Sequence, residues 1–186
     1  MLEKEPREPR YPSREIESRI LDCPAVVLVT DFEGNSKEHL GGAQSDAALC
    51  RLVLINELKS CLRNPEMISV NDIYRHSIVN AAFIFCRLAK VAPEGTVFIG
   101  VVDPGVGTER KSVIIQTEKK HFFVGPDNGI FYPAAIGEII EQVWRIGEAK
   151  FHDVSTTFHG RDIFTPVAAG IAKGVSLNSF GSRIDE

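Results

Sequence analysis

The chain of 186 residues lacks the features that define several large protein classes. No apolar run approaches the roughly 18 residues that a membrane-spanning helix requires, so we expect no membrane partner. Lys and Arg are scattered, and a net charge of −4 with a pI near 5.8 argues against nucleic acid as a partner, because phosphate binding needs a basic surface. These absences favour a soluble globular protein.

Cysteine is also scarce, and its spacing is uninformative. Cys23, Cys50, Cys61 and Cys86 form no CxxC motif and pair with no nearby histidine, so we predict no zinc or other metal site. Reduced, mostly buried thiols in a cytoplasmic protein are the expectation.

The N-terminal residues differ in composition from the rest of the chain. Residues 1–23 are rich in Pro, Glu and Arg and poor in large apolar groups, which predicts a flexible arm. Its acidic residues argue against a transit peptide. Residues 24–180 are long enough for one domain with its own core.

Short apolar runs alternate with helix-like segments in the first half of that domain. We predict strands at 25–30, 67–70 and 96–102, and helices at 45–62 and 77–91. Ser45 is a candidate N-cap, and Leu49, Leu52, Val53 and Leu58 are the apolar residues of the first helix. This alternation implies parallel strands joined by crossover helices.

The second half is richer in strands. We predict strands at 112–117 and 121–124, a short helix running into a strand over 139–146, and a helix over 163–173 that ends at Gly174. The predicted fold is therefore α/β, with a mixed, largely parallel sheet flanked by helices.

Three polar loops follow strands or precede a helix where ligands bind in such folds. Asp31 ends the first strand, residues 103–108 (DPGVGT) follow the third, and residues 155–162 (STTFHGRD) precede the last helix. Ligands of open α/β sheets sit at the carboxyl ends of the strands, so these loops predict a binding site.

Each loop alone also has a purely structural explanation. The two glycines of DPGVG suit a close approach to a ligand and a plain turn equally, and neither a Walker nor a Rossmann phosphate motif is present. Residues 125–129 (GPDNG) read as a tight turn. Residues 155–157 could cap the following helix, and His159 could be a core residue.

Taken together, the motifs are more specific. In order and spacing, TDF (30–32), PEGTVFIGVVDPGVGTERK (93–111), FFVGPDNGIF (122–131) and STTFHGRDIFTPVAAGIAKG (155–174) resemble the S-adenosylmethionine hydrolase family. Its members are also called S-adenosylmethionine hydroxide adenosyltransferases and are related to fluorinating and chlorinating enzymes. The resemblance spans roughly residues 25–186.

The resemblance implies hydrolysis of S-adenosyl-L-methionine to adenosine and L-methionine, by attack of water at C5′ and without a cofactor. It implies that Asp103, Arg110 and His159 handle the water and that Asp31 binds the ribose hydroxyls. Further implied positions are Thr157 and Phe158 around the reacting carbon, and Asn128, which we interpret as structural first and ligand-lining second. A homotrimer is also implied.

The residue types suit that chemistry. The leaving group is a neutral thioether and needs no acid, whereas water, with a pKa of about 15.7, is a poor nucleophile. An arginine stabilises developing hydroxide, a histidine can accept a proton, and an aspartate can orient the histidine or the water.

Two stretches depart from the family pattern. In residues 33–45, Lys37 stands in place of an aspartate and His39 in place of a tyrosine. Residues 181–186 correspond to the start of a link to a C-terminal β domain that in relatives supplies most adenine contacts. The alternative hypothesis is therefore a degenerate, non-catalytic module that binds adenosine or S-adenosylmethionine, or that serves in assembly.

Overall fold

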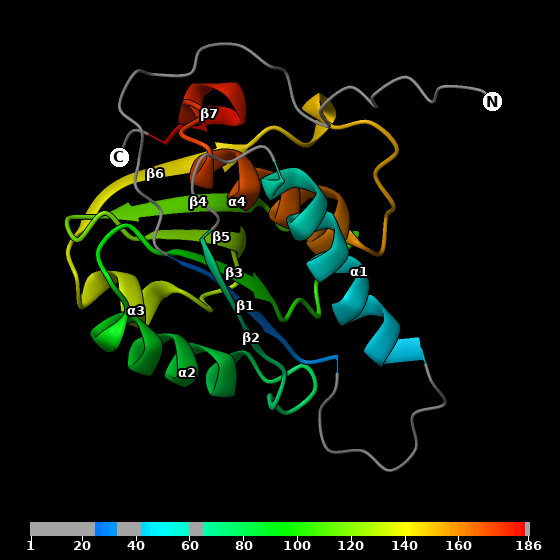
Figure 1. The fold of residues 1–186 in the computed structure, drawn as a ribbon, viewed down its shortest axis with the longest axis horizontal. Helices are drawn as coiled ribbons and strands as arrows, with labels where there is room; N and C mark the ends of the chain where they lie inside the picture. The colour runs from blue at the N-terminus through cyan, green and yellow to red at the C-terminus, as the bar shows by residue number, and fades with distance from the viewer. Residues whose placement is uncertain (1–24, 33–41, 60–64, 185–186) are drawn as a thin grey trace.

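The structure, a computed structural model, describes residues 25–32, 42–59 and 65–184 (Figure 1). The predicted arm at 1–23 and residues 33–41, with Lys37 and His39, lie outside the described residues. So do Cys23 and Cys61, whereas Cys50 is a buried free thiol and Cys86 a partly buried one.

In the described part of the chain, seven strands form one mixed sheet in the order β2–β1–β3–β5–β4–β6–β7. The strands β2 (Glu66–Val70), β1 (Ala25–Thr30), β3 (Val97–Val101) and β5 (Phe122–Pro126) are parallel to one another. The strands β4 (Ser112–Thr117), β6 (Ile140–Ile146) and β7 (Gly181–Arg183) pair antiparallel. The predicted α/β fold with a mixed sheet is confirmed.

Helices cover both faces of this sheet (Figure 1). On one face lie α1 (Gly42–Leu58) and α4 (Thr165–Ala172), and on the other lie α2 (Ile78–Val91) and α3 (Tyr132–Ile136). Every residue of β1, β3 and β5 is buried, which explains why their sequences are continuous apolar runs rather than alternating ones.

Of the four apolar residues that the sequence indicates for α1, only Leu58 is buried. The buried apolar residues of α1 are Ala47, Cys50, Leu54 and Leu58, at helical spacing, whereas Leu49 is 38% exposed and Leu52 60% exposed. The proposed N-cap at Ser45 is also wrong, because the helix already begins at Gly42.

Two other predicted helices need correction. The stretch 139–146 contains no helix, since Ile139 has a left-handed backbone (φ 65°) and the strand β6 begins at the next residue. The short helix lies earlier, at α3, where Pro133 occupies the first turn. The last helix begins before residue 163, because a π-helix (Gly160–Phe164) precedes α4.

A fully buried histidine links three loops at the end of the sheet opposite to the carboxyl ends of the parallel strands. His121 Nε2 lies 2.9 Å from the carbonyl oxygen of Pro93, so Nε2 carries a proton. Its Nδ1 lies 2.9 and 3.0 Å from the carboxylate oxygens of Glu138, which also accepts from Thr117 Oγ1. These bonds tie the connections before β3, β5 and β6 together.

The start of α2 gives a first testable prediction. Ser77 Oγ accepts a hydrogen bond from Asn80 N at 3.2 Å, which satisfies one of the free N–H groups of the first turn. We expect Ser77→Ala to lower the free energy of unfolding by about 1 kcal/mol in urea denaturation. Ser77→Asp should retain wild-type stability, and equal stability of the two variants would contradict the role of the cap.

Candidate functional site

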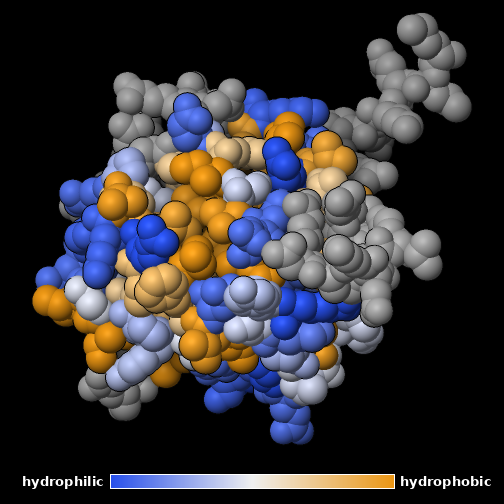
Figure 2. Space-filling view, turned by 90° about the horizontal axis from the view of Figure 1, so that it is seen from below, coloured by the Kyte–Doolittle hydropathy of each residue, from blue (hydrophilic) through white to orange (hydrophobic). Residues whose placement is uncertain are grey.

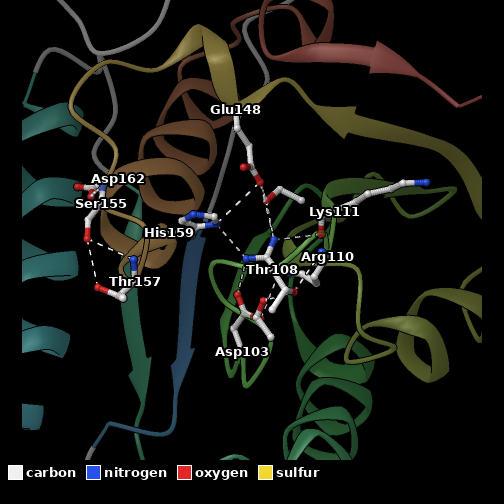
Figure 3. A network of polar contacts seen from close by, with 11 residues as sticks. Asp103, Thr108, Arg110, Lys111, Glu148, Ser155, Thr157, His159 and Asp162 are labelled. Atoms are coloured by element: carbon white, nitrogen blue, oxygen red, sulfur yellow. Dashed lines mark hydrogen bonds and ion pairs between the residues drawn. The ribbon is translucent and has the colours of Figure 1, made fainter.

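Polar side chains from four places in the chain meet at the end of the sheet where the parallel strands have their carboxyl ends (Figure 3). Asp103 follows β3, Arg110 and Ser112 stand at the start of β4, and Glu148 follows β6. They meet because β4 runs antiparallel to both β5 and β6, so its first residue lies where its neighbours end. His159 approaches from the loop before the π-helix.

Arg110 is the centre of this group. Its Nε and Nη2 donate to the two carboxylate oxygens of Asp103 at 3.1 and 2.5 Å, the bidentate geometry that favours arginine over lysine. Nη2 also lies 3.0 Å from His159 Nδ1. Nη1 donates to Ser112 Oγ at 2.8 Å and to the carbonyl oxygen of Lys111 at 3.1 Å. A guanidinium has five N–H groups, and each of those of Arg110 therefore has an acceptor among the described residues.

This arrangement fixes the tautomer of His159. An arginine donates and never accepts, so the contact with Arg110 makes Nδ1 of the neutral imidazole an acceptor. The ring proton of the neutral form is therefore on Nε2. The side chains of Asp103, Arg110 and His159 are each 7% exposed, so little water competes for these contacts.

Burial also changes the acidity of Asp103. The loss of hydration raises the pKa of Asp103 above its ordinary value, and the Arg110 guanidinium and then His159 lower it by less. The carboxyl group is therefore a stronger base than an exposed aspartate.

A buried aromatic ring and a tight turn hold His159 in place. The buried ring of Phe164 packs against both Arg110 and His159. Arg110 Cζ lies 5.5 Å from the centroid of the Phe164 ring, and the centroids of the His159 and Phe164 rings are 6.4 Å apart. Gly160 packs against β3, where an added Cβ would stand 2.4 Å from Val101 Cγ1. Thr165 Oγ1 donates to the Gly160 carbonyl at 2.7 Å and so satisfies an acceptor in the π-turn.

The two loops that the sequence marked as candidates are in contact. Gly107 has φ +78°, and a Cβ there would stand 2.7 Å from the carbonyl oxygen of Thr156. Glycine is therefore needed both for the backbone angle and for the close approach. Because the loops converge on one buried charged group, they form a candidate site rather than two separate turns.

Two of the predicted substrate-binding residues border this group. Asp31 is buried, and its Oδ2 accepts from His76 N at 2.6 Å. The next residue, Phe32, packs edge-on against Phe158 at 5.9 Å between centroids, and Arg161 Cζ lies 4.7 Å from the centroid of the Phe158 ring. The loop after β1 thus lies beside the loop that carries His159.

The other two predicted substrate-binding residues, Asn128 and Thr157, are hydrogen-bonded to nearby protein groups. Asn128 Nδ2 donates to the Val102 carbonyl at 3.0 Å and its Oδ1 accepts from Ile130 N at 3.2 Å, which fits the structural role expected first. Thr157 is exposed, with Oγ1 3.2 Å from Ser155 Oγ. The idea that residues 155–157 cap the next helix is wrong, since His159 is at the N-cap without a side-chain bond.

Residues 155 and 162 shape the turn instead. Asp162 is buried, and its Oδ2 accepts from Ser155 N at 3.0 Å. Arg161 pairs with the same carboxylate, from Nε at 2.6 Å and from Nη2 at 2.8 Å. Through its bond to Ser155, Asp162 thus closes the loop that precedes His159 (Figure 3).

Ser112 and Glu148 belong to the group but were not predicted. Ser112 Oγ donates to Glu148 Oε1 at 2.7 Å, and that oxygen lies 3.9 Å from Arg110 Nη1 and 3.8 Å from His159 Nδ1. Ser112 is close to Arg110 in the sequence, whereas Glu148 stands in no motif and is placed by the pairing of β4 with β6.

The described part of the chain contains no group of three or more His, Cys, Asp or Glu side chains placed to hold a metal ion. Within the same ranges, no helix is long and apolar enough to span a bilayer.

Several known sequences are similar to this chain. The sequence model of the SAM hydroxide adenosyltransferase N-terminal domain matches residues 57–181. The (R)-S-adenosyl-L-methionine hydrolase of Methanocaldococcus jannaschii is 32% identical over 168 residues, which are 90% of this chain and 59% of that protein. The enzyme of the same name from Salinispora tropica is 40% identical over 108 residues, covering 53% of this chain and 39% of its own.

Solved structures share the fold. An uncharacterized conserved protein from Thermotoga maritima superposes with a TM-score of 0.74 at 28% identity, over 87% of this chain and 59% of its own. A conserved hypothetical protein from Thermus thermophilus gives a TM-score of 0.66 at 26% identity, over 88% of this chain and 59% of its own. The chain thus spans about three-fifths of these proteins and of the archaeal hydrolase.

Proposed function

The chain belongs to the SAM hydroxide adenosyltransferase N-terminal domain family, and we propose that it hydrolyses S-adenosyl-L-methionine to adenosine and L-methionine. The observation that carries this proposal is the buried contact of Arg110 with both Asp103, from its own loop, and His159, from a distant loop. The hydrolase names of the relatives support the choice of substrate.

In the proposed reaction, water attacks C5′ of the adenosyl group. A C5′–O bond forms while the C5′–S bond breaks, its electron pair stays on the methionine sulfur, and one water proton is released. No acid is needed for the neutral thioether, and the step as written uses no cofactor.

Arg110 acts through its charge, because its N–H groups are already directed at protein acceptors. That charge stabilises the hydroxide that develops on the water. His159 offers its Nε2–H group to the water oxygen, since Nδ1 faces Arg110. We assign the water proton to Asp103, whose carboxylate is held in place by two bonds from Arg110 and whose pKa is raised by burial.

For the substrate, we propose that Asp31 binds the ribose hydroxyls and that Phe158 and Thr157 lie against the reacting carbon. The contact between Phe32 and Phe158 supports this, because it brings the Asp31 loop beside the loop of His159. A carboxylate has two acceptor oxygens and suits a vicinal diol. For Asn128 we propose a supporting role, because its side chain bonds the Val102 carbonyl directly after β3.

The proposal includes a homotrimer in the cytoplasm. Apolar side chains are exposed on the face of the molecule that carries α2 and α3, where Figure 2 shows hydrophobic residues gathered. They are Val79, Phe83, Tyr132 and Ile136. A surface of this kind is typical of contact with another protein surface.

The direct test is to incubate the purified chain with S-adenosylmethionine of both sulfonium configurations and to follow adenosine by chromatography. We expect adenosine and methionine in equal amounts, and we expect His159→Ala to remove most of the rate. Absence of product from a folded chain at high concentration would refute autonomous hydrolysis, and unchanged activity of His159→Ala would refute the roles given above.

The alternative function is a non-catalytic module that binds adenosine or S-adenosylmethionine. It is suggested by residues 33–45, where Lys37 and His39 stand at positions that the family pattern gives to an aspartate and a tyrosine. Calorimetry separates the two functions: adenosine binding without turnover supports the module, whereas turnover excludes it.

A further inference from the structure

Glu148 is a charged neighbour of Arg110 and His159 to which the proposed reaction gives no role. It stands directly after β6, at the start of a short 3-10 helix (Glu148–Lys150). Its side chain is 40% exposed, whereas those of Asp103, Arg110 and His159 are 7% exposed. Glu148 is therefore the most exposed charged member of the group, and its carboxylate points toward Arg110 and His159 (Figure 3).

Ser112 connects Glu148 to Arg110 through two hydrogen bonds that run in the same direction. The Ser112 hydroxyl accepts from Arg110 Nη1 at 2.8 Å and donates to Glu148 Oε1 at 2.7 Å. A hydroxyl has a single proton, so the carboxylate of Glu148 decides where that proton points and leaves the oxygen lone pairs to Arg110. Consecutive hydrogen bonds of this kind strengthen one another in a poorly hydrated site.

The rotation of the guanidinium determines what the other nitrogens contact. Its atoms are coplanar, so fixing Nη1 on Ser112 also fixes Nη2 between Asp103 and His159. Nη1 also donates to the Lys111 carbonyl, and Asp103 holds Nε and Nη2, so loss of the Ser112 bond would loosen the guanidinium rather than release it. Nη2 would then be held less firmly toward His159 Nδ1, and the proton of the imidazole would be less strictly confined to one nitrogen.

We propose that Glu148 is a positioning residue. Through Ser112 it holds the Arg110 guanidinium in the orientation that keeps the proton of neutral His159 on Nε2, the nitrogen assigned above to the attacking water. The effect on rate rests on the proposed hydrolysis, whereas the effect on the His159 tautomer does not.

Kinetics of Glu148→Ala, Ser112→Ala and the double variant test the connection. Each single change should lower kcat by about tenfold, the cost of one lost hydrogen bond to a charged group, with KM within about twofold of wild type. The double variant should be no slower than the slower single variant, because both changes interrupt the same path. Glu148→Gln should be intermediate, since its amide oxygen can still accept from Ser112.

Glu141 provides the matched control. It lies on β6, the strand that leads to Glu148, and its Oε2 accepts from Lys120 Nζ at 2.7 Å away from the group around Arg110. Glu141→Ala removes a glutamate with a comparable partner and should leave kcat within about twofold of wild type. Three results overturn the proposal: single losses that multiply in the double variant, a raised KM with unchanged kcat, or wild-type kcat in Glu148→Ala.

A second measurement does not depend on turnover. Nitrogen-15 NMR of the imidazoles in the full chain, with His159→Ala used for assignment, reports which nitrogen carries the proton of neutral His159. We expect the Nε2–H form in the wild type and in Glu141→Ala, and a mixture of both tautomers in Glu148→Ala and Ser112→Ala. If the wild type has no turnover but the tautomers shift as expected, hydrolysis is wrong and the positioning role stands. An unchanged tautomer in both variants overturns the positioning role, whatever the activity.

Discussion

Arg110→Lys is expected to lower kcat for S-adenosylmethionine hydrolysis by about 10²–10³-fold, the loss typical of removing one preorganised group that stabilises transition-state charge. The variant keeps a positive charge at the same position, so the change isolates geometry from charge. A lysine ammonium has three donors on a flexible stem, whereas Arg110 contacts Asp103, His159, Ser112 and the Lys111 carbonyl at once.

The expected cause is a loss of orientation in two partners. Without the fork geometry, the Asp103 carboxylate is no longer held from both oxygens and His159 Nδ1 loses its donor. Product formation under saturating substrate measures the effect, and thermal unfolding followed by circular dichroism checks the fold. Arg145→Lys on the exposed side of β6 is the control and should retain wild-type kcat. Activity of Arg110→Lys within about tenfold of wild type would argue that charge alone suffices.

The fold was predictable where burial determines the sequence. β1, β3 and β5 are buried on both faces, so their residues are apolar without interruption and can be recognised in the chain. α1 was predicted as a helix, but its apolar residues Leu49 and Leu52 are exposed, whereas the smaller Ala47 and Cys50 are buried. Apolar residues on both sides of a helix do not define which side faces the core.

The candidate site was predictable only in part, for a related reason. Asp103 and Arg110 stand in one loop and His159 in a motif at a helix start, so the rule that sites lie at the carboxyl ends of strands could bring them together. Glu148 stands in no motif, and its place depends on the register that sets Val113 opposite Arg145. Register between distant strands is set by packing and turns, which a single sequence does not display.

The π-helix was missed because its cause is tertiary. The sequence predicts a polar loop up to residue 162 and a helix from residue 163, and it contains no sign of a wider helical turn over 160–164. In the structure, Gly160 lies so close to Val101 of β3 that the chain has no room for a side chain there. Turns of this type are frequent at functional sites, and here the turn directly follows His159.

This close packing leads to the second large expected effect. Gly160→Ala places a Cβ 2.4 Å from Val101 Cγ1, so either the π-turn or β3 must move. We expect the free energy of unfolding to fall by about 1–3 kcal/mol, the usual cost of overpacking a core. The rate should fall by about 10²-fold, because His159 is the preceding residue and a displacement near 1 Å is enough for such a loss.

Val101→Ala supplies a test that separates this steric cause from any other effect of the substitution. It removes both Cγ atoms and leaves Val101 Cβ, which is 3.4 Å from the added carbon. The double variant Gly160→Ala/Val101→Ala should therefore recover much of the stability and rate that Gly160→Ala loses. The coupling between the two sites, from urea denaturation of the four proteins, should reach about 0.5–3 kcal/mol. Gly137→Ala is the matched control, since its φ of −67° suits alanine and its nearest neighbour is 3.4 Å away. Strictly additive losses at 160 and 101 would show that contact with β3 is not what requires glycine before the π-turn.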